Sequence, residues 1–476
     1  MSAPSKSSGN YQSRDAASTA TDSNWRKLIP RRLIEVVLAA LVVLVISTHL
    51  QYLLDVRTAV PHQDDWSLAD KMFQAIDSHR IGAFVFDRPN GHFMVPSALA
   101  YLVSLRYLSL DLIPLRLLNF PICLLAFLLT AHVINVGVRS QLLRFYLYLG
   151  ACFVIFNLSH WVHFSLGFGF TTPVSALFGG IGLHYIAKAT QFSLKRGSNL
   201  IVGFAFLVAS VLSFGAGYPA AAAAISLLAF SGLKKLTVSR PLRGYEAIVY
   251  CLAYALGLLA IASHPSFHFE SRLIQTIFHV VLVAGSIGPS AFDPNSLMTQ
   301  NLAYVCGVIF VIAALSVGLN FLVKQTPFRK PLPILSLGLV LFGLFGCIAV
   351  AVARSQLPVG EFLSTRYTLY PSIGLLGTLL YLACSRVFLL AHMWCFVVVG
   401  YLVTTLEELQ IAPYRPAAYK AIESAMRNID NLSDEELRAT LYWRENTEGV
   451  RRVVARMRRD RLNVFRGGRN TSDAQH

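Results

Sequence analysis

The chain has 476 residues, of which 55% are hydrophobic and only 14% are charged, and its mean hydropathy is +0.54. Soluble domains contain roughly a quarter charged residues, so this composition excludes an ordinary soluble protein and predicts an all-α, polytopic membrane protein. The net charge of +16 does not predict nucleic acid as a partner, because the positions of the basic residues have another explanation, given below.

The amino-terminal residues 1–31 are rich in Ser, Ala, Asn and Asp without periodicity, which predicts a disordered tail. Eleven apolar stretches that follow are predicted as spanning helices, since a crossing needs about 20 apolar residues. The stretch 33–54 lacks a cleavage site and is predicted to remain as the first span. The eleven stretches are 33–54, 113–136, 142–158, 170–190, 199–213, 217–231, 245–263, 300–323, 334–353, 367–385 and 388–406.

The distribution of Lys and Arg predicts the orientation. If the amino end is cytoplasmic, the later short outside loops hold only Arg272, Arg354 and Arg366. The excess on the other side is typical of cytoplasmic loops and accounts for much of the net charge. The later inside loops hold Arg139, Arg144, Lys188, Lys195, Arg196, Lys234, Lys235, Arg240, Arg243, Lys324, Arg329, Lys330 and Arg386.

The carboxyl-terminal residues 407–476 are predicted to form a small helical domain outside the membrane. Pro416 suits the start of a first helix, and Ser433-Asp-Glu-Glu436 is a capping box that opens a second. Val450, Val453, Val454 and Met457 follow helical spacing and predict a third helix with an Arg-rich opposite face. Solvation explains that face, and contact with anionic headgroups is the alternative.

The first outside loop, about 55–93, contains most of the residues that could perform chemistry. His62-Gln-Asp-Asp-Trp66 places two adjacent carboxylates, Asp64 and Asp65, just past a span. Such a pair could supply a general base and, with His62, could bind a divalent metal such as Mg²⁺ or Mn²⁺. The alternative is a solvated acidic turn that caps a helix starting near Trp66.

Basic side chains in the same loop and in a later loop could bind a phosphate group. Arg80 and Arg88 are candidates, although ion pairs with Asp77 or Asp87 would explain them equally. Arg366, within Ser364-Thr-Arg-Tyr367, stands where a loop meets an apolar helix. A phosphate contact or snorkelling to lipid headgroups would explain that position.

The segment between the third and fourth spans has a polar and aromatic composition. It contains His160, Trp161 and His163 and then Gly167-Phe-Gly-Phe170. The histidines could line a sugar site, while an interfacial aromatic belt explains Trp161.

These motifs, in this order, resemble the GT-C superfamily of glycosyltransferases that use polyprenyl-phosphate sugars, and within it a poorly characterised bacterial branch. The resemblance extends from Leu33 to Phe465. It is based on Asp64-Asp65-Trp66, Asn90-Gly-His92, Gly167-Phe168, the broken hairpin from Ser213 to Pro219, and Ser364 to Tyr367. The chain departs from related sequences at Gly91, Phe93 and Gly169, which puts the acceptor and the sugar in doubt more than the reaction class.

The resemblance implies a membrane-embedded catalytic domain over 32–406, with juxtamembrane helices in a periplasmic loop over 55–112. It also implies inverting transfer of a sugar to a periplasmic glycan, lipid or protein such as a pilin, at the inner membrane of a bacterium. Asp64 or Asp65 would be the base. Arg366, then Arg88 and Arg80, would hold the donor phosphate. The substrate-binding residues would be His62, Trp66, Asn90, His92, His160, His163 and Tyr367.

Two other classes of function remain open from the sequence. A transporter or flippase of lipid-linked substrates would explain the spans and the broken hairpin, but it has no need of a loop loaded with Asp, His and Arg. A glycan polymerase or ligase would use a diphosphate-linked donor, and such enzymes more often have their large functional loop later in the chain.

Overall fold

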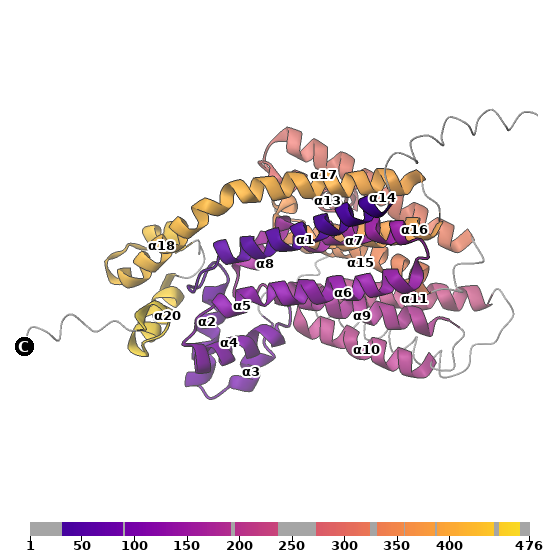
Figure 1. The fold of residues 1–476 in the computed structure, drawn as a ribbon. Coiled ribbons are helices and arrows are strands. Elements are labelled where there is room, and N and C mark those ends of the chain that lie inside the picture. The colour runs from indigo at the N-terminus through magenta and orange to yellow at the C-terminus, as the bar shows by residue number, and fades with distance from the viewer. Residues whose placement is uncertain are drawn as a thin grey trace, which may run out of the picture.

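The computed structural model describes residues 31–88, 91–191, 196–236, 273–323, 331–356, 358–385, 388–441 and 447–466, and within these ranges every regular element is a helix. Long helices lie side by side in a bundle, and shorter helices gather at one end of it (Figure 1). This end holds the residues that follow the first helix together with the carboxyl-terminal tail. We call it the loop end.

Seven helices are long and apolar enough to cross a membrane, so the chain is a membrane-embedded protein. Each of them coincides with one of the eleven predicted spans. Their bounds are Arg32–Asp55, Ile113–Gly137, Gln141–Ser165, Arg196–Ser213, Leu297–Phe321, Pro331–Ala353 and His392–Arg427.

Three further predicted spans are helices, but they do not meet the same criteria of length and apolarity. They are α9 (Thr171–Ala189), α11 (Gly217–Leu236) and α16 (Leu369–Ser385). The predicted span 245–263 and the predicted disordered tail, apart from Arg31, lie outside the described residues. The sequence analysis did not anticipate α13 (Leu273–Ala284), a short apolar helix that packs between α14 (Leu297–Val323) and α15 (Pro331–Ala353).

Small residues allow the bundle helices to approach closely. A Cβ on Gly343 of α15 would lie only 2.6 Å from the Cα of Gly374 on α16. A Cβ on Gly203 of α10 (Arg196–Ser213) would lie 3.1 Å from the carbonyl oxygen of Gly182 on α9. In lipid, where apolar burial drives helix association only weakly, such close packing is a main source of stability.

The first loop forms three short helices at the loop end: α2 (Asp65–Asp77), α3 (Ile81–Val85) and α4 (Val95–Leu108). The span that follows begins with the short helix α5 (Ile113–Leu117) and continues into the long helix α6 (Asn119–Gly137). The sequence predicted juxtamembrane helices here, including a helix that starts near Trp66.

The tail has the three helices that the sequence predicted: α18 (Arg415–Arg427), α19 (Asp434–Leu441) and α20 (Thr447–Arg459). The capping box is formed, because the Glu436 amide donates to Ser433 Oγ at 3.2 Å and the Ser433 amide donates to Glu436 Oε2 at 2.8 Å. The four residues spaced along α20 from Val450 to Met457 are buried. They share one hydrophobic core with Trp66, Met72 and other residues of the first loop, separate from the core of the bundle.

The Arg-rich face of α20 makes ion pairs that attach the tail to α2. Arg452 pairs with Asp70 at 2.9 Å and Arg456 with Asp77 at 2.6 Å. Asn463 continues the attachment, since its side-chain amide donates to the carbonyl oxygens of Ala59 at 2.8 Å and Leu110 at 2.7 Å. Part of this face therefore contacts protein rather than water or lipid.

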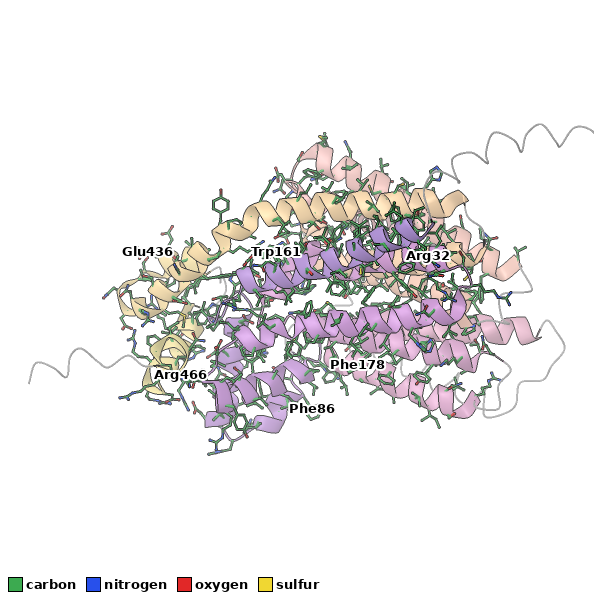
Figure 2. The ribbon with its side chains drawn as sticks, in the orientation of Figure 1. Arg32, Phe86, Trp161, Phe178, Glu436 and Arg466 are labelled. Atoms are coloured by element: carbon green, nitrogen blue, oxygen red, sulfur yellow. The ribbon has the colours of Figure 1, made fainter. Side chains whose placement is uncertain are left out.

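Because the tail packs on the first loop, the two lie on the same side of the membrane. Helix α1 (Arg31–Asp55) starts at the opposite end of the bundle, as Arg32 and Arg466 show in Figure 2. The described chain therefore starts and ends at opposite ends of the bundle.

We expect reporters fused after residue 466 and inserted near residue 88 to give the same topology result. With the orientation that the basic loops predict, alkaline phosphatase is active at both positions and a cytoplasm-dependent fluorescent protein is dark. Opposite results at the two positions would contradict the packing of the tail on the loop.

Candidate functional site

The two adjacent carboxylates of the first loop lie in different environments. Asp65 is the first residue of α2 and its side chain is wholly buried, with 0% exposure. Asp64 occupies the N-cap position, is half-buried, and does not cap the helix through its side chain. Of the two carboxylates, that of Asp65 therefore faces the core.

Four donors surround the Asp65 carboxylate. Oδ1 accepts from the Tyr101 hydroxyl at 2.5 Å and from the Gly167 amide at 2.9 Å. Oδ2 accepts from Arg116 Nη2 and from the His62 amide, each at 3.1 Å. Burial raises the pKa of Asp65, while Arg116, Tyr101 and the amides of Gly167 and His62 oppose that rise. All four neighbours are donors, an arrangement that suits the ionised form of the carboxylate.

Arg116 completes the arrangement from α5. Its side chain is 2% exposed, and it also donates to the backbone carbonyl oxygens of Thr58 and, at 2.8 Å, Val60. Gly167 permits the close approach, since a Cβ there would lie 2.8 Å from the Tyr101 hydroxyl oxygen and 3.3 Å from Asp65 Oδ1. We call Asp65, Arg116, Tyr101 and Gly167 the buried anchor.

This geometry favours a structural role for Asp65, and Asp64 is the more exposed carboxylate of the pair. The same geometry does not fit the metal site suggested for His62 and the acidic pair, because both Asp65 oxygens already accept from Arg116, Tyr101 and amides. Within the described part of the chain, no group of three or more His, Cys, Asp or Glu side chains could hold a metal ion.

His62 and Trp66 are buried at the junction of loop and tail. Trp66 is 1% exposed and belongs to the core that both share. The His62 ring stands edge-on to Tyr419 of α18, with 5.9 Å between centroids. Burial, and next Arg116 and Arg415, lower the pKa of His62 to about 3.

The anchor is linked by hydrogen bonds to the segment that contains His160 and His163. The Asn119 side-chain amide donates to the carbonyl oxygens of Arg116 at 2.9 Å and His163 at 3.4 Å. Both histidines are buried, His160 in η3 (Leu158–His160) and His163 in α8 (Trp161–Ser165). This segment therefore connects the first loop to the bundle.

The same histidines contact the loop before α16. His163 Nε2 lies 3.1 Å from the carbonyl oxygen of Arg366, and His160 Nδ1 lies 2.9 Å from Thr368 Oγ1. The Arg366 guanidinium is exposed, and its Nε donates to Ser364 Oγ at 3.2 Å. Tyr367 is buried. The Arg366 backbone is thus fixed while its charged group remains accessible.

Arg88 and His92 lie against the broken hairpin between α10 and α11. The His92 ring centroid is 5.5 Å from that of Phe214, and a Cβ on Gly215 would lie 2.9 Å from the His92 ring. Arg88 is exposed and stacks over the Phe93 ring at 4.2 Å. Asn90, the remaining member of this motif, lies outside the described residues.

The ion pairs suggested from sequence for Arg80 and Arg88 are not formed. Asp77 pairs with Arg456 at 2.6 Å, and Asp87 pairs with Lys71 at 2.8 Å. Arg80 is exposed at the N-cap position of α3.

A second buried ion pair, which the sequence analysis missed, lies where α17 (Phe388–Ile411) enters the tail. Arg415 Nη2 lies 2.7 Å from Glu408 Oε2, which also accepts from the Tyr52 hydroxyl at 3.1 Å. The Arg415 guanidinium stacks over Trp161 at 3.8 Å. Trp161 is half-buried and makes a cation–π contact with this arginine. The contact is additional to the interfacial role that the sequence predicted for Trp161.

Arg116 was also missed, although the sequence contains a signal for it. Arg116 is a single arginine within the apolar stretch Ile113–Phe120. An ionisable residue inside an apolar segment usually has a buried partner, so a search for that partner would have led to the acidic pair.

No protein-family model, curated protein or solved structure matches this chain.

The two carboxylates should differ in their contribution to stability. Asp65→Asn leaves Arg116 buried without its counter-charge, so we expect it to lower the free energy of unfolding by about 3–5 kcal/mol. Asp64→Asn, the matched control at the half-buried carboxylate next to it, should cost clearly less, because it leaves the Asp65–Arg116 pair intact. Unfolding in mixed micelles measures both. Equal stability of the two variants would remove the structural role of Asp65.

Acid should weaken the junction between loop and tail. The folded protein keeps His62 neutral, with a pKa of about 3, whereas the unfolded chain takes up a proton near the ordinary value of 6.5. The His62 contribution is fully present above 6.5 and is lost as the pH falls from 6.5 towards 3, by at most about 1.4 kcal/mol per pH unit. His62→Gln should lose this part of the pH dependence, measured by unfolding from pH 7.5 to pH 5. An unchanged pH dependence in the variant would contradict the assignment.

Proposed function

We propose that the chain is a membrane glycosyltransferase that moves a sugar from a polyprenyl-phosphate donor to an acceptor hydroxyl outside the cytoplasmic membrane. The observation that supports this most is the convergence of separate motifs at the loop end. The first loop, the His160–His163 segment and the Ser364–Tyr367 loop are joined by the bonds from Asp65 through Arg116, Asn119 and His163 to Arg366.

Asp64 is the better general base of the acidic pair, because Asp65 has no accessible oxygen. In the proposed step the acceptor oxygen attacks the anomeric carbon while its proton passes to the Asp64 carboxylate. The bond between the anomeric carbon and the phosphate oxygen breaks, and polyprenyl phosphate leaves with the electron pair. A single displacement of this kind inverts the anomeric configuration.

The leaving phosphate requires positive charge, and three exposed guanidinium groups are candidates to supply it. Arg366 is the first candidate, because its backbone is held by His163 while its fork of donors remains accessible. Arg88, stacked on Phe93 beside the broken hairpin, is the second, and Arg80 is the more peripheral third.

The remaining residues of the proposed site divide into two groups by exposure. His92 is half-buried beside the hairpin, where it could contact a sugar. The second group is buried and would act on substrate binding only indirectly, by fixing the positions of neighbouring residues. It consists of His62, Trp66, His160, His163 and Tyr367. The acceptor would be a surface glycan, a glycolipid or a surface protein.

Transport of a lipid-linked substrate is the competing proposal, and the distribution of charge argues against it. Among the described residues, both buried ion pairs, Asp65–Arg116 and Glu408–Arg415, lie at the loop end. A transporter concentrates its polar binding groups near the middle of the membrane.

Replacement of Asp64 tests the base. A general base contributes about 100- to 10,000-fold in rate. In deletion cells, the wild-type gene should restore the missing surface glycan, and a gene with Asp64→Asn should not. Mass spectrometry of surface glycans and glycoproteins measures it. The matched control is Asp55→Asn, an exposed carboxylate at the end of α1, which should restore the product fully. Full activity of the Asp64 variant at an equal protein level would contradict the proposed glycosyl transfer and favour transport of a lipid-linked substrate instead.

Replacement of Arg366 tests the donor phosphate contact. Arg366→Lys keeps the charge but loses the forked donor geometry, so we expect a raised apparent KM for the donor or a large loss of activity, with normal stability. Arg354→Lys, an exposed arginine earlier in the same loop, is the matched control. Kinetics like those of the control would reduce Arg366 to a headgroup contact.

A further inference from the structure

Gln63 has a backbone conformation that glutamine rarely adopts. Its φ is 49°, in the left-handed region, and it directly precedes Asp64 in the chain. Glycine enters this region without a steric penalty, whereas an L side chain is crowded there by the following carbonyl group. Such strained residues persist only where the surrounding structure fixes them, and they cluster at functional sites. The side chain at position 63 therefore needs an explanation that the backbone does not supply.

The buried anchor and the bonds around it fix this conformation. The His62 amide donates to Asp65 Oδ2, and the Asp65 amide donates to the His62 carbonyl oxygen, each at 3.1 Å. The Trp66 amide donates to the Gln63 carbonyl oxygen, also at 3.1 Å. Position 63 lies among these bonds, so the chain turns there to bring the Asp65 carboxylate into the core. Glycine would suit this turn at least as well, and only the side chain distinguishes glutamine from it.

The other described non-glycine residues with positive φ have structural explanations. Three of them lie at the carboxyl ends of α2, α4 and α20, where a left-handed residue commonly ends a helix. These three are His79, Ser109 and Arg461. Leu110 is wholly buried in the core, and Asn463 attaches the tail through its side-chain amide. Gln63 stands before a helix and has neither explanation.

Gln63 and Asp64 form the part of this turn that reaches the surface. Residues 60–62 and 65–66 are buried, whereas Gln63 and Asp64 are both half-buried. The Gln63 side-chain amide forms no hydrogen bond with the part of the chain that the structure describes. A primary amide has two donors and an acceptor, so it can bind hydroxyl groups and other polar groups of a ligand. Its neighbour along the chain is the carboxylate proposed to remove the acceptor proton.

We propose that Gln63 binds the acceptor, with its side-chain amide hydrogen-bonded to polar groups next to the hydroxyl that Asp64 deprotonates. This assignment rests on the proposed glycosyl transfer and gives that reaction a residue that determines acceptor specificity. Because the anchor fixes the backbone of both residues, the amide holds the acceptor at a constant position relative to the base. A glycine at position 63 would relieve the backbone but would lose these hydrogen bonds.

Thermal unfolding of the full-length protein in mixed micelles tests whether the Gln63 side chain is structural. Gln63→Gly should unfold at a temperature no lower than the wild type, because glycine adopts the left-handed conformation without strain. Arg461→Gly is the matched control, since Arg461 is exposed, has a φ of 53° and lies in the tail. It should behave in the same way. A lower unfolding temperature for Gln63→Gly than for the control would show a structural role for the side chain and overturn the proposal.

Complementation of deletion cells, at an equal and limiting level of protein, tests the contact with the acceptor. Mass spectrometry of surface glycans and glycoproteins should show roughly tenfold less product with Gln63→Gly, because hydrogen bonds to the substrate are lost. Gln63→Asn, which keeps a shorter amide, should retain more product, and Arg461→Gly should give the wild-type amount. Wild-type product from Gln63→Gly would overturn the proposal while glycosyl transfer stands. Absence of product with the wild-type gene would overturn the transfer itself, and the role of Gln63 with it.

Discussion

The assembly at the loop end depends on one buried carboxylate and the donors that surround it. An ionised Asp65 with no exposure to water is costly, and only the combination of Arg116, Tyr101 and two backbone amides offsets that cost. Because these donors come from the residues before α2, from α4, from α5 and from the segment after α8, the carboxylate holds four parts of the chain together. If one donor is lost, the remaining donors no longer offset the free-energy cost of burying the Asp65 carboxylate. The four parts of the chain should therefore form and unfold as a unit.

The tail extends this unit. Its arginines were open to two explanations from sequence, solvation or headgroup contact, and several instead pair with acids of α2 and of the tail itself. These pairs explain how an arginine-rich segment can lie, in the predicted orientation, on the side that positive loops avoid. Its charges are largely neutralised by Asp70, Asp77 and nearby acids, and the orientation rule counts short loops rather than folded domains.

The sequence predicted those features that depend on local pattern. Helices occupy ten of the eleven predicted spans, with the eleventh outside the described residues, and the capping box at Ser433 and the apolar side of α20 are formed. It could not predict which of Asp64 and Asp65 is buried, since the two are identical in type and adjacent. That choice is made by Arg116 and Gly167, which are 51 and 102 residues from Asp65. The GT-C likeness and the chemistry derived from it remain predictions.

The two carboxylates suggest how one motif can combine rigidity with access. Four donors fix Asp65, and the backbone of Asp64 is therefore fixed as well, one residue earlier at the start of α2. A base must be held within a fraction of an ångström of its productive position, and a neighbour locked in the core provides this more firmly than an exposed loop could.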